Sequence, residues 1–311
     1  MSAADEESRS SLTVGVVVVT YNRRALLEDT LRYLDQQHYP IGRIFVIDNA
    51  STDGTKEFLT KLEMPRCETV FMEKNVGGAG GFAAGMEIAY RSGVDLVWVM
   101  DDDVQPAEDA LEKLVKALHD LKALGRDPNF VTCNVFNTEG EPVNAPILDL
   151  RIQTNGNMRI TALLAEGLLP AVACSFVGPL FVRQAIARHG LPIAEMFIWG
   201  DDIEYTYRMT AEREAGYVVG DAKIVHLGRA TELSLAKEQD WSRAEKYFYL
   251  FRNNTYALRK YGNKQKIGAY LLANIREFFE LLVHLEIRKL GILVSGLYQG
   301  IRFNPNIRMV D

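Results

Sequence analysis

The sequence predicts an α/β protein in which a mostly parallel sheet is flanked by helices. Strand patterns alternate with helix patterns through the first half of the chain, and this order is typical of parallel sheets with right-handed crossovers. The first strand pattern, Val14–Thr20, is a nearly continuous run of β-branched residues. Such a run is expected of a strand that is covered on both faces.

The first two strand patterns are each followed by a helix pattern. Val14–Thr20 precedes a predicted helix over Arg24–Gln37, and a second strand is predicted over Arg43–Asp48. The segment 48–54 is rich in turn-forming residues, and Thr55–Leu62 then has a helical pattern. These elements form two consecutive strand–helix units.

Two further strands complete the predicted parallel sheet. They span Thr69–Glu73 and Asp95–Met100, with a helix over Gly81–Ser92 between them. Ligands of such sheets bind beyond the carboxyl ends of the strands. Three polar segments that follow strands are therefore expected at one edge of the sheet, namely 20–23, 48–53 and 101–103.

Three adjacent carboxylates, Asp101, Asp102 and Asp103, follow the fourth strand. Their mutual repulsion near a buried strand end favours a bound divalent cation, because Mg²⁺ and Mn²⁺ prefer carboxylate oxygen and share their coordination with phosphate. Side-chain alternation places Asp101 and Asp103 on one side of the chain and Asp102 on the other. The alternative is a solvated turn that caps a helix beginning near Pro106.

A glycine-rich segment, Asn75–Phe82, precedes the third predicted helix. Its glycines let the backbone come close to a ligand, and the unpaired N–H groups of a helix start can bind a phosphate. The segment lacks the Lys-Ser or Lys-Thr of a Walker loop and the spacing of the dinucleotide fingerprint. A tight strand-to-helix turn without a ligand is the alternative.

Composition indicates a globular chain that does not bind nucleic acid broadly. With 311 residues and 48% hydrophobic content the chain can bury a large core, and its formal charge of −6 supplies no basic face for nucleic acid. The polar, acidic segment 1–12 is expected to be disordered and lacks the features of a signal peptide, so we expect a cytoplasmic protein. The three cysteines show no disulfide or zinc pattern.

Taken in order, these motifs resemble those of the family 2 inverting glycosyltransferases, which have a GT-A fold. The resemblance rests on Val-Thr-Tyr-Asn-Arg after the first strand, Ile-Asp-Asn-Ala-Ser-Thr-Asp-Gly-Thr after the second, the glycine-rich segment, and Asp-Asp-Asp. Several motifs in one order are more specific than any single motif. The resemblance implies a GT-A catalytic domain over residues 13–260 that binds a nucleotide-sugar donor.

The resemblance also implies which residues contact the donor. The nucleotide pocket would be lined by Thr20, Asn22, Arg23, Asp48 and Asp53, with Asp48 reaching the base or the ribose. Further donor contacts are assigned to Tyr21, Asn49, Asn75, Gly77, Gly78 and Asp102. Asp101 and Asp103 would hold Mn²⁺ or Mg²⁺ on the donor diphosphate.

A second acidic group, Asp201 and Asp202, follows the apolar residues Phe197–Trp199. Apolar surroundings raise the pKa of a carboxylate, and a general base near neutrality benefits from that. The alternative is that one of the two only caps the helix predicted over Ile203–Ala215.

The resemblance gives these residues roles in catalysis and acceptor binding. In the resembled family a Trp/Phe–Asp–Asp–x–Glu segment carries the base that deprotonates the acceptor hydroxyl, which implies Asp202 in preference to Asp201. Trp199 and Glu204 of the same segment are assigned to the acceptor, a glycan or lipid-linked glycan.

His226 follows another predicted strand, where related enzymes place a third metal ligand. Neutral imidazole binds Mn²⁺ acceptably, so this ligand would favour Mn²⁺ over Mg²⁺. A structural histidine of the core is the alternative.

Finer features of the resemblance imply the donor sugar. The doubled glycine motif and the Trp199–Glu204 pattern are most similar to galactofuranosyltransferases, which use UDP-galactofuranose. The Tyr247–Asn253 segment is also similar to rhamnosyltransferases, so dTDP-rhamnose is the competing donor. Two alternative functions from other classes are a sugar nucleotidyltransferase and a non-catalytic module that binds a sugar nucleotide.

The C-terminal region, 261–311, has a helical pattern that is rich in apolar residues and contains several basic ones. No apolar run reaches the roughly 18–20 residues that span a bilayer. Basic and apolar faces on one helix suit peripheral contact with an anionic membrane, where a lipid-linked acceptor would lie. Packing against the catalytic domain, or against a second subunit of a homo-oligomer, is the alternative.

Overall fold

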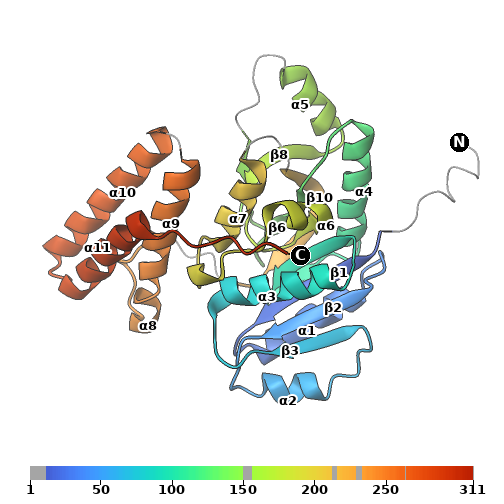
Figure 1. Ribbon diagram of the computed structural model, residues 1–311, viewed down its shortest axis with the longest axis horizontal. Helices are drawn as coiled ribbons and strands as arrows, with labels where there is room; N and C mark the ends of the chain where they lie inside the picture. The colour runs from blue at the N-terminus through green and yellow to red at the C-terminus, as the bar shows by residue number, and fades with distance from the viewer. Residues whose placement is uncertain (1–11, 150–155, 212–215, 229–232, 263, 311) are drawn as a thin grey trace, which may run out of the picture.

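The computed structural model of the protein describes residues 12–149, 156–211, 216–228, 233–262 and 264–310. The segment 1–12, which was predicted to be disordered, lies outside the described residues except for its last residue. The described part consists of an α/β body and a cluster of helices beside it (Figure 1).

A 10-stranded sheet forms the centre of the body. Its strands are β1 (Val14–Thr20), β2 (Arg43–Asp48), β3 (Cys67–Phe71), β4 (Leu96–Asp101), β5 (Val104–Pro106), β6 (Phe130–Phe136), β7 (Ile147–Leu148), β8 (Leu168–Ala173), β9 (Pro179–Val182) and β10 (Gly216–His226). The spatial order is β3-β2-β1-β4-β9-β6-β10-β8-β7, and β5 pairs with the end of β10. The first four strands are parallel, as predicted. Beyond β4 the sheet is mixed, because β9 lies antiparallel between β4 and β6.

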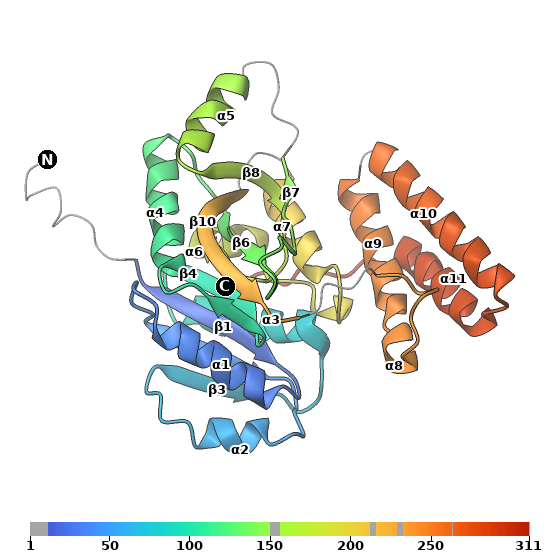
Figure 2. The ribbon, with the colours of Figure 1, turned by 180° about the vertical axis from the view of Figure 1, so that it is seen from behind.

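Helices cover both faces of the sheet. The helices of the described chain, only some of which lie on the sheet, are α1 (Arg24–Asp35), α2 (Thr55–Thr60), α3 (Gly77–Arg91), α4 (Ala110–Ala123), α5 (Gly156–Ala165), α6 (Arg183–His189), α7 (Asp201–Thr210), α8 (Trp241–Ala244), α9 (Tyr247–Tyr261), α10 (Lys264–Val283) and α11 (Ile287–Arg302), with a short 3₁₀ turn at Ala194–Met196. Helices α1, α2 and α4 pack on one face, and α3, α6 and α7 on the other. Helix α1 lies in front of the sheet in Figure 2, and α3 in Figure 1.

The alternation of side chains along β1 explains the two layers of core. Val16 and Val18 belong to the apolar cluster under α1, whereas Val17 and Val19 belong to the cluster under α3. Helix α3 lies so close to the sheet that a Cβ atom on Gly81 would come within 2.6 Å of Val19. The glycines of this helix therefore serve close helix–strand packing.

Several predicted boundaries shift. Helix α3 begins at Gly77 and not at Gly81, so the glycine-rich segment is the first turn of the helix and not a loop before it. Strand β3 lies two residues earlier than predicted, α4 begins at Ala110, and the short strand β5 was not predicted. The helix predicted over Ile203–Ala215 ends at Thr210, and residues 212–215 lie outside the described residues.

Helices α8 to α11 form a unit with its own small core, here called the helical cluster. The buried residues of that core are Leu235, Ala244, Tyr247, Phe251, Leu281, Leu290 and Leu293. The cluster begins before residue 261, so a division of the chain at 260 separates α9 from the helices that it packs against. No helix within the described ranges is long and apolar enough to cross a membrane.

The last described residues are not helical, although the sequence predicted a helical tail to Asp311. From Phe303 the chain runs back to the α/β body (Figure 1). There the carbonyl oxygen of Arg308 accepts a hydrogen bond from the N–H of Leu191 at 2.9 Å. The Arg308 side chain lies 2.6 Å from a carboxylate oxygen of Glu87. The tail thus attaches the helical cluster to the body.

Candidate functional site

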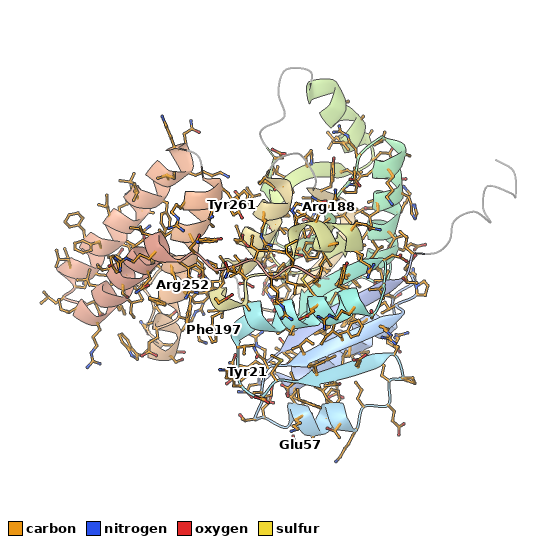
Figure 3. The ribbon with its side chains drawn as sticks, in the orientation of Figure 1. Tyr21, Glu57, Arg188, Phe197, Arg252 and Tyr261 are labelled. Atoms are coloured by element: carbon orange, nitrogen blue, oxygen red, sulfur yellow. The ribbon has the colours of Figure 1, made fainter. Side chains whose placement is uncertain are left out.

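The carboxyl ends of β2, β1 and β4 lie side by side at one edge of the sheet. In the parallel register Thr20 pairs with Asp48, and Val19 pairs with Asp101. The polar segments that follow these strands therefore meet, as the sequence predicted. Tyr21, directly after β1, is 44% exposed and lies at this edge of the body (Figure 3).

Side chains of the loops after β1 and β2 tie the two loops together. The Oδ1 atom of Asn22 accepts a hydrogen bond from the N–H of Thr52 at 2.6 Å, and Asp53 accepts one from the N–H of Arg24 at 3.1 Å. Asp48 is 1% exposed, and its carboxylate bonds within its own loop. Asn22, Asp48 and Asp53, all predicted donor contacts, thus hold the loops in shape.

Two asparagines shape the entry to α3. The amide of Asn49 donates to the carbonyl oxygen of Gly77 at 2.9 Å and accepts from the N–H of Val76 at 2.9 Å. Asn75 accepts from the N–H of Gly77 at 2.8 Å. In this arrangement Asn49 and Asn75 position the glycine-rich turn.

Gly77 permits a close approach between the start of α3 and the chain segment before α7. Gly77 has a φ of +75°, and a Cβ atom added to it would lie 2.0 Å from the carbonyl oxygen of Phe197. That oxygen accepts a hydrogen bond from the N–H of Ala79 at 3.1 Å. On the side where a Cβ atom would stand, Gly77 thus faces the chain segment before α7, whereas Gly78 lines the cleft described next.

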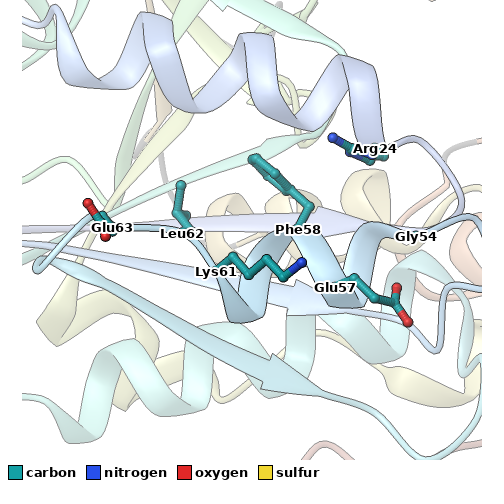
Figure 4. Close-up of a pocket in the computed structure, with 7 residues that line it drawn as sticks. All are labelled: Arg24, Gly54, Glu57, Phe58, Lys61, Leu62 and Glu63. Carbon is teal, nitrogen blue, oxygen red and sulfur yellow. The ribbon is translucent and has the colours of Figure 1, made fainter.

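A cleft of about 550 Å³ opens at this edge, and residues from both halves of the chain line it. It is lined by Arg23, Gly78, Phe82, Asp101, Asp103, Asn144, Ser175, Phe176, Val177, Ile198, Trp199, Asp201, Asp202, His226, Gly228, Arg243 and Lys246. The predicted metal ligands and the predicted base thus share one space. A second depression of about 500 Å³, between α1 and α2, holds none of the predicted site residues (Figure 4).

Asp101, Asp103 and His226 form a cluster in which one ligand atom from each lies within 4.8 Å of the others. The pairing of β5 with β10 builds it, because His226 stands opposite Val104 in that antiparallel register. Burial, and then repulsion by the neighbouring carboxylates, raise the pKa of Asp101 well above its ordinary range. A cation at this point would relieve that repulsion.

The donor set fits a divalent cation. The Nδ1 atom of His226 lies 2.9 Å from Oδ1 of Asn144, an acceptor, which leaves the lone pair on Nε2. Nε2 lies 3.2 Å from Oδ1 of Asp103. Apart from this contact with the imidazole, the buried oxygen has no hydrogen-bond partner among the described residues. Two carboxylates and an imidazole are suitable ligands for Mn²⁺.

Asp102 points away from this cluster, as the alternation predicted. It accepts hydrogen bonds from Oγ1 of Thr20 at 2.6 Å and from the guanidinium of Arg23 at 3.2 Å. Burial raises the pKa of Asp102 to about 6, and those two hydrogen bonds oppose the rise. The same guanidinium lies 2.8 Å from Asp103, so Arg23 links both carboxylates to the loop after β1.

The carboxylates of Asp201 and Asp202 line the same cleft, at the start of α7. Asp202 accepts a hydrogen bond from the N–H of Ile203 at 2.7 Å. Burial raises the pKa of Asp202 to about 6. Burial and repulsion by Asp202 raise the pKa of Asp201 well above its ordinary range. With a pKa of about 6, Asp202 is mostly ionised near neutral pH. Paired carboxylates whose surroundings differ can divide acid and base roles.

Trp199 and Glu204, both predicted to bind the acceptor, have different surroundings. Trp199 lines the cleft, with its ring edge-on to Tyr247 at 5.2 Å. Glu204 is fully buried, lies 3.0 Å from the guanidinium of Arg208, and accepts a hydrogen bond from the hydroxyl of Tyr261 at 2.8 Å. The structure therefore does not bring Glu204 to the cleft, because its carboxylate joins α7 to α9.

Sequence reasoning missed several residues that line the cleft. Asn144, Ser175 and Phe176 lie in connections of the second half of the sheet, where no recognisable motif marks them. Arg243 and Lys246 stand just before the Tyr247–Asn253 segment and add positive charge to the wall. These two residues reach the cleft because the helical cluster packs against the body.

A family model described as glycosyl transferase family 2 matches residues 15–183. The chain belongs to this family. The match favours a glycosyltransferase over the nucleotidyltransferase and the non-catalytic module that the motifs left open. The glycosyltransferase is 27% identical to the galactofuranosyltransferase GlfT1 of Mycolicibacterium smegmatis over 294 residues, which cover 89% of this chain and 96% of that relative.

Solved structures show that the glycosyltransferase has the GT-A fold. The mannosyltransferase PcManGT from Pyrobaculum calidifontis, in complex with GDP-Man and Mn²⁺, is 17% identical with a TM-score of 0.55 over 96% of this chain and 77% of that one. GalNAc-T7 with UDP, GalNAc and Mn²⁺ is 16% identical with a TM-score of 0.57, over 79% of this chain and 52% of that one. This chain thus spans about half the length of GalNAc-T7. Inversion is typical of family 2.

Proposed function

We propose that the protein transfers galactofuranose from UDP-galactofuranose to a hydroxyl of a glycan or lipid-linked glycan, with inversion and with a divalent cation. The observation that carries the proposal is a single cleft that holds the ligand cluster Asp101, Asp103 and His226 together with the carboxylates of Asp201 and Asp202. The choice of sugar is supported by similarity to a galactofuranosyltransferase over nearly the whole of both chains.

Asp101, Asp103 and His226 would hold the cation, and the imidazole ligand favours Mn²⁺ over Mg²⁺. When bound, the cation supplies positive charge that stabilises the departing nucleoside diphosphate. The side chain of Arg23 lines the cleft, lies 2.8 Å from Asp103 and brings a second positive charge to the same region. The donor diphosphate is thus expected between the strand ends and Gly78.

Asp202 would act as the general base. Its carboxylate accepts the proton of the acceptor hydroxyl while that oxygen forms a bond to the anomeric carbon and the bond from this carbon to the diphosphate oxygen breaks. Attack from the side opposite the leaving group inverts the anomeric centre. Trp199 offers an apolar ring face next to the base, suited to a sugar ring of the acceptor.

Calorimetric titration with UDP-galactofuranose and with dTDP-rhamnose, each with and without Mn²⁺, tests the choice of donor. We expect binding of UDP-galactofuranose that requires Mn²⁺, and at least about tenfold weaker binding of dTDP-rhamnose. The reverse preference would assign the protein to rhamnosyl transfer. Binding of neither donor would contradict both.

We further propose that the protein is cytoplasmic and meets its acceptor at an anionic membrane surface. The outer sides of α10 and α11 expose large apolar side chains, among them Leu271, Phe279, Val283, Ile287 and Ile301, all at least 51% exposed. Residues 264–302 contain six Lys and Arg against three Glu, in a chain whose formal charge is −6. Apolar side chains beside local positive charge suit anionic lipid.

A further inference from the structure

The backbone directly before Asp201 is strained. Phe197 and Trp199 have φ angles of +64° and +61°, in the left-handed region that non-glycine residues rarely adopt. Such a backbone conformation is unfavourable and persists only where its surroundings fix it. Because this turn, residues 196–199, ends two residues before Asp201, its conformation sets the direction in which the two carboxylates enter the cleft.

All four carbonyl groups of the 196–199 turn accept hydrogen bonds from other helices. The Nδ2 atom of Asn253, in α9, lies within hydrogen-bond distance of the carbonyl oxygens of Met196 at 2.9 Å, Ile198 at 3.1 Å and Trp199 at 2.8 Å, and these three acceptors share its two N–H groups. The remaining oxygen, that of Phe197, accepts from the N–H of Ala79 in α3. The strained backbone is therefore held from two sides, and one buried amide makes most of the contacts.

The Asn253 side chain is itself fixed. It is 0% exposed, and its Oδ1 atom accepts a hydrogen bond from Nε of Arg252 at 3.0 Å. The same guanidinium donates to the carbonyl oxygen of Glu195 at 2.6 Å and lies 4.2 Å from the ring centroid of Phe303. Figure 3 labels Arg252 and Phe197, which lie where the helical cluster meets the body.

We propose that Asn253 is a positioning residue for transfer: its amide fixes the 196–199 turn so that Trp199 and Asp202 face the acceptor. The inference rests on the proposed function for the identity of the reaction. Asn253 does not line the cleft. Its loss is therefore expected to affect the transfer step, and to leave donor and metal binding by the residues at the strand ends unchanged.

The test compares Asn253→Ala and Asn253→Asp with wild type. The first variant removes the amide from the carbonyl groups of Ile198 and Trp199, while that of Met196 keeps the N–H of Ile198 as a donor at 2.7 Å. The second variant keeps the shape but replaces the N–H groups with oxygen. Asn274→Ala is the matched control, since Asn274 is a buried helical asparagine of the same cluster whose amide donates to Tyr270 within its own helix. Three quantities are measured: kcat from UDP release with a membrane extract as acceptor source, Mn²⁺-dependent Kd for UDP-galactofuranose, and hydrogen exchange of the segment 195–203.

We expect kcat to fall at least about tenfold in both Asn253 variants, since misplacement by about 1 Å can cost a factor near 100. Kd for the donor should stay within about twofold, and exchange should rise in segment 195–203 without rising in the sheet. Unchanged kcat with faster exchange would overturn the positioning role, as would equal losses of kcat and donor binding. Absence of UDP release by wild type would instead contradict the proposed function, and exchange would still decide whether Asn253 holds the turn.

Discussion

Asp202 is expected to act through its negative charge. Asp202→Asn keeps the size of the side chain and removes the base, so we predict that transfer falls by about 10²–10⁴-fold, while Mn²⁺-dependent binding of UDP-galactofuranose is retained. Asp201→Asn is the comparison variant, because Asp201 is the neighbouring carboxyl of the same cleft and burial raises its pKa well above its ordinary range. UDP release and calorimetry measure the two effects. Retained transfer in Asp202→Asn would move the base to Asp201 or elsewhere.

The raised pKa of Asp202 predicts the pH dependence of transfer. Its folded value of about 6 means that the ionised, basic form is lost as the pH falls through 6. We therefore expect kcat/KM to be level above about pH 7 and to fall about tenfold for each unit below the pKa. A profile that stays level between pH 5 and 7 would contradict Asp202 as the base.

His226→Ala tests the third metal ligand. The substitution leaves Asp101 and Asp103 in place, so binding of the donor should survive at high Mn²⁺, with the half-saturating Mn²⁺ concentration raised at least about tenfold. His284→Ala, at an exposed histidine after α10, is the control. An unchanged metal titration in His226→Ala would rule out the ligand role.

At the scale of elements, the close packing of α3 against the segment before α7 is expected to contribute to the free energy of unfolding. Gly77→Ala would force a Cβ atom into the carbonyl of Phe197, in addition to the strain of a positive φ. Gly93→Ala is the matched control, since Gly93 has a φ of +84° with nothing within 4 Å of the added atom. We predict that Gly77→Ala lowers the free energy of unfolding by about 2 kcal/mol more than Gly93→Ala does. Urea unfolding of both variants measures this, and equal losses would contradict the close contact.

Elements with strong local patterns were predictable, and long-range pairings were not. The bounds of β1 and β2 follow from β-branched runs that end in polar residues, and the structure has both as predicted. The start of α3 was missed because glycine has a low helix propensity, and here tertiary packing overrides it. The approach of His226 to Asp103 depends on the pairing of β5 with β10, and only the family resemblance indicated it.

The same contrast holds among candidate site residues. A strand-end position was enough to predict where Asp101 and Asp103 lie, because parallel strands end together. Glu204 was assigned to the acceptor from its motif alone. Its ion pair with Arg208 and its bond to Tyr261 come from helix packing that no local pattern reveals.

At the scale of the whole molecule, the helical cluster is predicted to carry the membrane contact. We expect wild type to sediment with vesicles that contain phosphatidylglycerol, less with pure phosphatidylcholine, and to be released by salt. Phe279→Glu with Val283→Glu, at positions 57% and 75% exposed, should abolish sedimentation, whereas Leu164→Glu, at a position 60% exposed on α5, should not. Vesicle binding unaffected by the double change would contradict the proposal. A dimer seen by analytical ultracentrifugation, and lost with the double change, would assign this face to a second copy instead.

The central claim is metal-dependent, inverting transfer in one cleft, and product analysis tests it most directly. Wild-type protein is incubated with UDP-galactofuranose and a membrane lipid extract, with Mn²⁺ or with EDTA, and the product is examined by NMR. The account predicts a galactofuranosyl product formed only with the cation, with an anomeric configuration opposite to that of the donor. A product of unchanged configuration, or equal yield in EDTA, would contradict it.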